Sequence, residues 1–143
     1  MCLLKTSYIF VLLWSSTGAQ LNGTQSVGVV GRLLCFGQPM SDVLVKLYDV
    51  DKGLNPDDLV DQSRSLWNGA FVVSGSVDER SPIDPKLNIY HDCNDGWKPC
   101  QRKISFIVPP KYISKGSLIQ RFFNVGTLEL ADEYPNETRD CFH

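Results

Sequence analysis

The chain has 143 residues, of which 43% are hydrophobic and 21% charged, and its formal net charge at pH 7 is -2. This weak acidity says little about partners, and no nucleic-acid partner is expected. No apolar run approaches the roughly 18–20 residues that span a bilayer, so no transmembrane segment is expected.

Residues 1–19 have the pattern of a secretory signal peptide. Lys5 is their only charge, Tyr8 to Trp14 form an uninterrupted apolar core, and Thr17-Gly18-Ala19 has the small residues that signal peptidase accepts. Removing this segment with Lys5 would change the net charge from -2 to -3. We expect residues 20–143 to form a single secreted, extracellular domain.

Short runs of alternating, β-branched and aromatic residues follow, separated by glycine, proline and asparagine. In chain order, they predict strands at 27–36, 43–48, 59–65, 70–77, 87–93, 104–108 and 122–130. Asn68-Gly69 is a turn, and at most one helical turn fits between Pro109 and Ser117. The pattern predicts an all-β sandwich of about seven strands in two sheets. Residues 131–143 carry no strand signal.

Four cysteines remain once Cys2 leaves with the signal peptide, namely Cys35, Cys93, Cys100 and Cys141. An even number in an exported chain predicts two disulfides. Because Cys93 and Cys100 flank an Asn94-Asp95-Gly96 turn, we expect a Cys93–Cys100 clip, with Cys35–Cys141 tethering the C-terminal tail. Three pairings are possible in principle.

His91 shares one face of its predicted strand with Leu87, Ile89 and Cys93, which favours a buried, hydrogen-bonded core histidine over a pH-sensing or catalytic one. A zinc site of His91, Cys93 and Cys100 lacks a fourth local ligand and is disfavoured in an oxidising compartment. No metal ion or other cofactor is therefore expected.

Two Asn-x-Thr sequons, at Asn22 and Asn136, predict glycosylation near both ends of the exported chain.

The charges are polarised along the chain. Residues 42–61 hold six acids, and Asp49 to Asp58 is an acidic loop without the glycine and glutamate positions of an EF-hand. A solvated loop is the favoured interpretation, with a looser calcium site among Asp49, Asp51, Asp57 and Asp58 as the alternative. Residues 98–121 hold six bases and no acid. This basic run is either an ordinary solvated face or an anion-binding face, for which the candidates are Lys98, Arg102, Lys103 and Lys111.

Six motifs spread over the exported chain carry a family resemblance. They are Gly31-x-Leu33-x-Cys35-x-Gly37-x-Pro39, Val43-x-Val45-Lys46-Leu47-x-Asp49, Ile83-Asp84-Pro85, Ile89-Tyr90-His91-Asp92-Cys93, Pro99-Cys100-x-Arg102-Lys103 and Gly126-x-Leu128-x-Leu130. In this order they resemble the transthyretin-like proteins of nematodes. The resemblance implies a secreted, prealbumin-like Greek-key β-sandwich in a family whose members mostly have no established biochemical activity.

Three classes of function follow as hypotheses. The favoured one is a secreted binding or adaptor protein that recognises a cell-surface protein, a glycan or an anionic lipid. The second, by analogy with transthyretin, is a carrier of a small apolar ligand in an oligomer. The third is a 5-hydroxyisourate hydrolase, which is disfavoured because Gly28 to Arg32 contain no histidine and the chain ends Arg139 to His143 instead of Tyr-Arg-Gly-Ser. No catalytic residues are therefore assigned.

Overall fold

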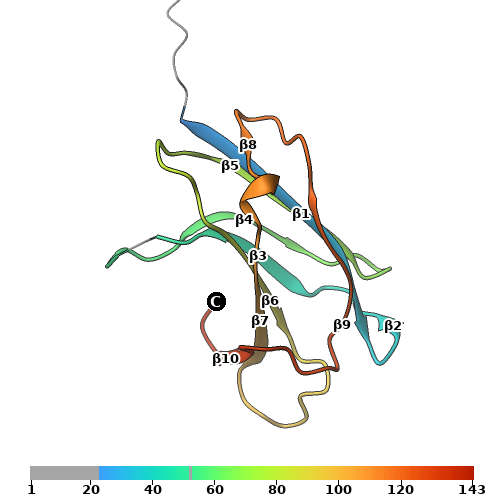
Figure 1. Ribbon diagram of the computed structural model, residues 1–143. Helices are drawn as coiled ribbons and strands as arrows, with labels where there is room; N and C mark the ends of the chain where they lie inside the picture. The colour runs from blue at the N-terminus through green and yellow to red at the C-terminus, as the bar shows by residue number, and fades with distance from the viewer. Residues whose placement is uncertain (1–22, 52) are drawn as a thin grey trace, which may run out of the picture.

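The computed structural model describes residues 23–51 and 53–143, and the predicted signal peptide, Cys2 and Asn22 lie outside them. The described residues form ten strands and one 3-10 helix (Figure 1): β1 (Thr24–Cys35), β2 (Gln38–Pro39), β3 (Leu44–Asp49), β4 (Asp58–Arg64), β5 (Ala70–Asp78), β6 (Pro85–His91), β7 (Gln101–Ile107), η1 (Pro110–Tyr112), β8 (Ser114–Lys115), β9 (Phe123–Glu129) and β10 (Thr138–Asp140). No helix among these residues is long and apolar enough to cross a membrane.

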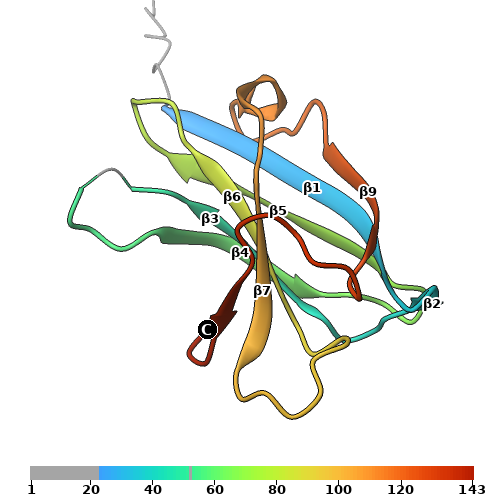
Figure 2. The same ribbon diagram turned by 60° about the horizontal axis from the view of Figure 1, so that its bottom comes forward.

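The strands form two sheets that pack face to face (Figures 1 and 2). In the first, β1 is central, with antiparallel β5 on one side and parallel β9 on the other, while β2 and β8 pair with its two ends. The second is antiparallel throughout, in the order β10-β7-β6-β3-β4. The predicted all-β sandwich is confirmed, and so is the short helical turn, which is η1.

The core lies between the sheets and follows the period-two alternation of the sequence. It is built from inward-facing residues of both layers, including Val27, Val29 and Leu33 of β1, Val45 and Leu47 of β3, Phe71 and Val73 of β5, Leu87 and Ile89 of β6, and Ile104 of β7. The Asn68-Gly69 turn joins the layers at a close approach of backbones. Gly69 has a φ of +81°, and a Cβ there would lie 2.3 Å from the carbonyl oxygen of Leu33.

The C-terminal tail contains a strand that the sequence did not predict. Residues Thr138–Asp140 form β10, which pairs with the edge strand β7. Beyond it, the His143 ring stacks on Tyr90, with the ring centroids 4.1 Å apart. Tyr90 points away from the core, so its burial comes from the tail and from Lys46, whose Nζ lies 5.9 Å from the ring centroid. The tail thus covers an edge and part of the outer face of this sheet.

All four cysteines in the described residues form disulfides, but the predicted pairing is wrong. Cys35 pairs with Cys93, and Cys100 pairs with Cys141. Cys93 continues the inward face of β6 and is buried, so it meets the end of β1 in the opposite sheet rather than the far side of its own turn. Cys100 precedes β7 and lies beside the tail. With these sulfurs in disulfides, the zinc alternative is excluded as well.

Candidate functional site

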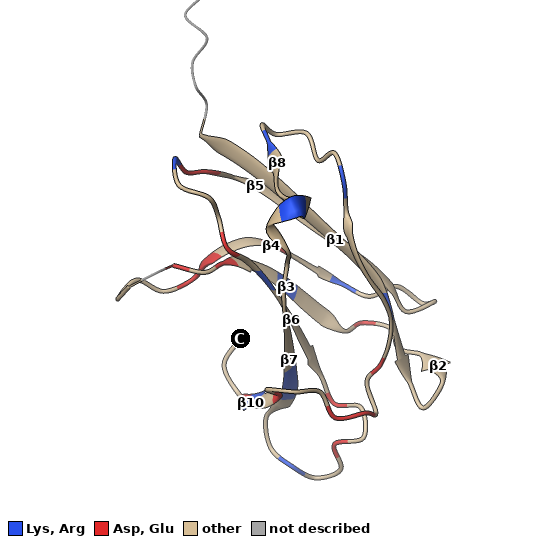
Figure 3. Ribbon diagram, viewed as in Figure 1, with Lys and Arg blue, Asp and Glu red and all other residues tan. Residues whose placement is uncertain are grey.

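The four predicted anion-binding residues do not gather in one place. Lys98 lies in the loop between β6 and β7, Arg102 and Lys103 lie on β7, and Lys111 lies on η1. In Figure 3, η1 is at the opposite end of the sandwich from β10 and the β6–β7 loop. The basic run of the sequence is therefore divided between two ends of the molecule.

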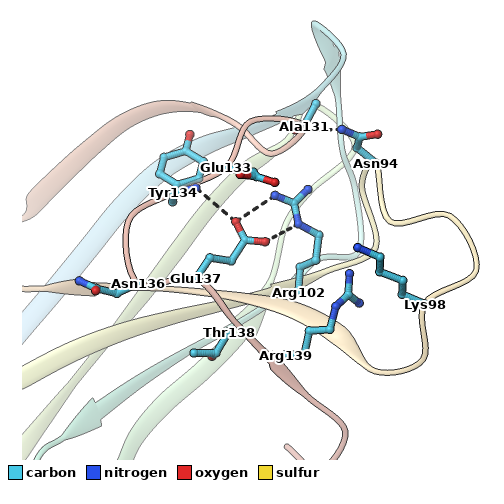
Figure 4. A pocket seen from close by; sticks show the side chains of 10 residues that line it. All are labelled: Asn94, Lys98, Arg102, Ala131, Glu133, Tyr134, Asn136, Glu137, Thr138 and Arg139. Carbon is cyan, nitrogen blue, oxygen red and sulfur yellow. Dashed lines mark hydrogen bonds and ion pairs between the residues drawn. The ribbon is translucent and has the colours of Figure 1, made fainter.

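Arg102 is a buried structural residue, with only 5% of its surface exposed. Its Nε and Nη2 donate to the two carboxylate oxygens of Glu137 (Figure 4). Its remaining N–H groups donate to the carbonyl oxygens of Cys93 at 2.7 Å, Leu130 at 2.8 Å and Asp132 at 2.7 Å. All five donors of the guanidinium are satisfied within the chain. Arg102 therefore has none left for an external anion, and its predicted binding role is wrong.

The same end of the sandwich holds two further ion pairs to the tail. Lys103 Nζ lies 3.4 Å from Asp140, and Arg139 pairs with Asp95 of the β6–β7 loop. The hydrogen bond from Arg139 holds the pKa of Asp95 below its usual value. Lys98 and Asn136 line a neighbouring cavity of about 510 Å³ together with Arg102, Glu137 and Arg139, as Figure 4 shows. Three charged residues of its lining, Arg102, Glu137 and Arg139, form ion pairs within the chain that hold the tail in place. Asn136 is exposed, and its glycosylation stays a prediction.

His91 is 1% exposed, and its Nδ1 accepts a hydrogen bond of 3.1 Å from the Cys93 N–H. Burial, reinforced by the positive charge of Arg102, lowers the pKa of His91 to about 4. The prediction of a buried, hydrogen-bonded core histidine is confirmed.

The end of the sandwich that carries η1 is different, because its cations have no acidic partners. Lys111, Lys115 and Arg121, which we call the η1 cluster, form no ion pair with any described Asp or Glu residue. Two of them flank one aromatic ring: Lys111 Nζ lies 5.2 Å and the Arg121 guanidinium 5.6 Å from the ring centroid of Tyr112. Such contacts orient the cations while leaving their charge exposed.

The loop that carries the η1 cluster is held in place by backbone and side-chain contacts. Pro109 and Pro110 end β7 and begin η1, since proline cannot donate to a sheet. After β8, the Gly116 N–H donates to the Thr24 carbonyl at 2.8 Å, and the Gln120 N–H donates to Ser114 Oγ at 3.0 Å. Between these anchors Leu118 is 78% exposed. An exposed leucine thus lies between Lys115 and Arg121 in a restrained loop.

A groove of about 810 Å³ adjoins this loop. It runs between β1 and the turn after β5, and its lining includes Gln25, Arg80, Pro82, Ile113 and Lys115. The lining combines aliphatic surface with two cations, Arg80 and Lys115, and one acid, Glu79. This arrangement suits an amphipathic anionic ligand better than a reaction that needs an acid, a base and a nucleophile.

Sequence reasoning included only Lys111 of the η1 cluster among its candidates. Lys115 and Arg121 belong to the basic run, but the run does not show which of its members find acids elsewhere in the chain. Arg102 and Lys103 form ion pairs with Glu137 and Asp140, which lie in the tail whose position was not predicted. The one available signal was a leucine, Leu118, between the bases Lys115 and Arg121 and directly after Gly116-Ser117.

Comparison with known proteins agrees with this two-sheet, disulfide-linked sandwich, a class of fold that presents loops at its ends. Residues 30–109 match the Transthyretin-like family. Three Caenorhabditis elegans proteins are similar over most of their length. Transthyretin-like protein 5 is 50% identical, covering 94% of this chain and 97% of that one. Transthyretin-like protein 33 is 44% identical over 96% and 94%, and transthyretin-like protein 2 is 41% identical over 84% of each. The chain belongs to the transthyretin-like family.

Proposed function

We propose that this chain is a secreted, extracellular binding protein that attaches to anionic membrane surfaces through the η1 cluster and Leu118. The single observation that carries the proposal is the exposed leucine between cations that have no acidic partner, in a loop fixed by hydrogen bonds to β1. The proposal concerns binding and not catalysis. The signal-peptide pattern of residues 1–19 and the two disulfides support export to an oxidising compartment.

The expected affinity follows from the groups involved. Each base near an anionic membrane contributes about 1 kcal/mol, and burying a leucine side chain contributes about 2 kcal/mol. Three bases and one leucine together give about 5 kcal/mol, which corresponds to a Kd of roughly 0.2 mM in accessible lipid. Binding of this strength is reversible. It weakens with salt, because the Debye length falls from about 10 Å at 0.1 M to about 3 Å at 1 M.

Sedimentation with vesicles tests this directly. The oxidised protein should pellet with vesicles of phosphatidylcholine and phosphatidylserine, and should remain in the supernatant with phosphatidylcholine alone. Lys111→Gln/Lys115→Gln/Arg121→Gln should reduce affinity by about 100-fold, and Leu118→Ser by about 10-fold or more. Lys98→Gln is the matched control for Lys115→Gln, because both lysines are exposed and neither forms an ion pair with an acid in residues 23–51 or 53–143.

Two outcomes would contradict the proposal. One is that the triple variant and the native chain pellet equally. The other is that vesicles do not bind the native chain at all, while heparin beads retain the native chain and Leu118→Ser equally. That result would assign the cluster to a sulfated glycan.

The second candidate function, carriage of a small apolar ligand, is favoured only by the groove beside the η1 cluster, whose volume of about 810 Å³ is in the range of small-molecule sites. Titration of the protein with fatty acids and iodothyronines, followed by intrinsic fluorescence, tests it. Saturable quenching that Ile113→Trp abolishes would support the carrier, and a linear response would reject it.

A further inference from the structure

The connections at the ends of β3 and β5 bring acidic side chains together around a small cavity. Asp49 is the last residue of β3, Asp51 follows it, and Glu79 directly follows β5. One carboxylate oxygen from each of these three residues lies within 4.8 Å of the other two. Asp84, which precedes β6, lines the same cavity of about 560 Å³, and so does the exposed Arg80. Figure 3 shows the acids of these connections in red.

Asp49 differs from an ordinary surface acid because it is buried, with 2% of its surface exposed. Its Oδ1 accepts a hydrogen bond of 2.8 Å from the Asp84 N–H. Its Oδ2 is enclosed and receives no hydrogen bond from an N–H or O–H group of the described residues, and the Glu79 carboxyl group lies beside it. A buried carboxylate oxygen without a partner is costly, and it normally has a cation, a proton or a donor beside it. The expectation of a solvated loop is therefore wrong for Asp49.

No cation of the described residues forms an ion pair with Asp49, Asp51 or Glu79. Burial is the main cause that raises the pKa of Asp49, and the carboxylates of Asp51, Asp84 and Asp58 add to it. The pKa of Glu79 is also raised, chiefly by the charge of Asp49. The negative charges of the cluster thus oppose one another.

The backbone holds these acids close together despite that repulsion. The Val50 N–H donates to the Asp84 carbonyl at 3.0 Å, so β3 and the chain entering β6 are fastened on both sides of Asp49. At the other connection, the Glu79 N–H donates to the Gly23 carbonyl at 2.9 Å. Because both segments are tied to the sandwich, their backbones stay close, and the carboxylates can move apart only by side-chain rotation.

We propose that Asp49, Asp51 and Glu79 bind a calcium ion, with Asp84 beside it in the same cavity. Carboxylate oxygens are the ligands that calcium prefers, and calcium tolerates the irregular geometry of ligands drawn from separate loops. Magnesium requires near-ideal octahedral geometry and gives up its waters reluctantly, so it binds more weakly here. For a site with this many acids but few enclosing loops, the expected Kd is about 0.1–1 mM, in the range of extracellular calcium modules.

Two measurements on the oxidised protein test the proposal: calorimetric titration and thermal melts. Bound metal ions are first removed with EDTA, and the ionic strength is held constant. Calcium chloride should give a saturable one-site isotherm. At ten times the Kd, calcium should raise the folded-to-unfolded ratio about 11-fold, which raises Tm by about 5 °C in a domain of this size. Magnesium chloride at the same concentration should give less than half of that shift.

The variant Asp51→Asn/Glu79→Gln should abolish both the isotherm and the calcium-dependent shift. Both side chains lie on connections and are only partly buried, so this variant should fold. Without calcium, its Tm should equal or exceed that of the native chain, since two opposing charges are gone. Asp132→Asn/Glu133→Gln is the matched control, because it removes the same charges from exposed tail positions. It should leave calcium binding unchanged.

Either of two results would overturn the site. The first is a native protein whose Tm does not respond to 10 mM calcium chloride but rises as the pH is lowered from 7 to 5, which would assign the cluster to a shared proton. The second is an equal calcium response in the native chain and in Asp51→Asn/Glu79→Gln, which would assign binding elsewhere. Vesicle binding is measured separately without calcium, so the two proposals fail independently.

Discussion

Replacing Arg102 with methionine is the sharpest test of how the tail is held. Methionine keeps most of the aliphatic stem but removes the guanidinium, whose five donors serve Glu137 and three carbonyl oxygens. The side chains of Arg102 and Glu137 are 6% and 17% exposed, so the pair is largely shielded from solvent. The variant leaves a carboxylate near the interior with no compensating charge.

The size of the effect follows from this burial. Removing one partner of a buried ion pair costs about 3–5 kcal/mol, because the other charge is left uncompensated. The carbonyls of Cys93 and Leu130 also lose a donor each, but water reaches the opened tail and replaces part of that loss. We expect Arg102→Met to lower the free energy of unfolding by about 4 kcal/mol, and Tm by about 15 °C for a domain of this size.

Urea denaturation of the oxidised protein, followed by circular dichroism, measures this free energy. Glu137→Gln keeps the shape of the partner but not its charge and should cost about 1–2 kcal/mol. The double variant Arg102→Met/Glu137→Leu leaves no lone charge. Its loss of stability should therefore be smaller, by about 2 kcal/mol or more, than the sum of the losses in the single variants Arg102→Met and Glu137→Leu. Lys98→Met, in the same cavity but without an ion pair, should change stability by less than about 0.5 kcal/mol.

The reasoning would be refuted if Arg102→Met unfolded within about 1 kcal/mol of the native chain. Strict additivity of Arg102→Met and Glu137→Leu would refute it as well, since it would show that the two side chains do not interact.

Three other predictions concern separate parts of the molecule. His91 has a folded-state pKa of about 4, below the ordinary 6.5, so its contribution to stability is complete above pH 6.5 and is lost as the pH falls toward 4. Between pH 7 and pH 4.5, the free energy of unfolding should therefore fall by about 2–3 kcal/mol more in the native chain than in His91→Phe. Equal falls in the two chains would contradict the buried neutral state. Gly69→Ala should cost about 3 kcal/mol in a urea titration, because of the positive φ and the contact with Leu33; a cost below about 1 kcal/mol would disprove the close approach. Cys100→Ser/Cys141→Ser should remain folded, lose about 4 kcal/mol of stability and expose the tail to limited proteolysis. Non-reducing peptide mapping of the native chain should find the Cys100–Cys141 peptide, and a Cys93–Cys100 peptide would reject the pairing.

The features that the sequence determined are those that depend on local alternation. Period two along the runs containing Val45, Phe71 and Ile89 determines which side chains face inward, and so it predicted the two-sheet sandwich and the burial of His91. The asparagine and glycine at residues 68 and 69 likewise determined a turn, since a positive φ there needs no other part of the chain.

Only the tertiary structure decided which distant groups meet. Cys93 pairs with Cys35 because an inward residue on β6 faces the end of β1 across the core, whereas the spacing of Cys93 and Cys100 suggested a local bond. In the same way, Glu137 neutralises Arg102 because the tail returns along β7, whereas Lys111, Lys115 and Arg121 form no ion pair with a described acid. Asp49 and Glu79 are 30 residues apart in the sequence and come together because β3 and β5 end at the same end of the sandwich. Contacts of this kind depend on how the sheets stack and on the path of the connections, which no local pattern encodes.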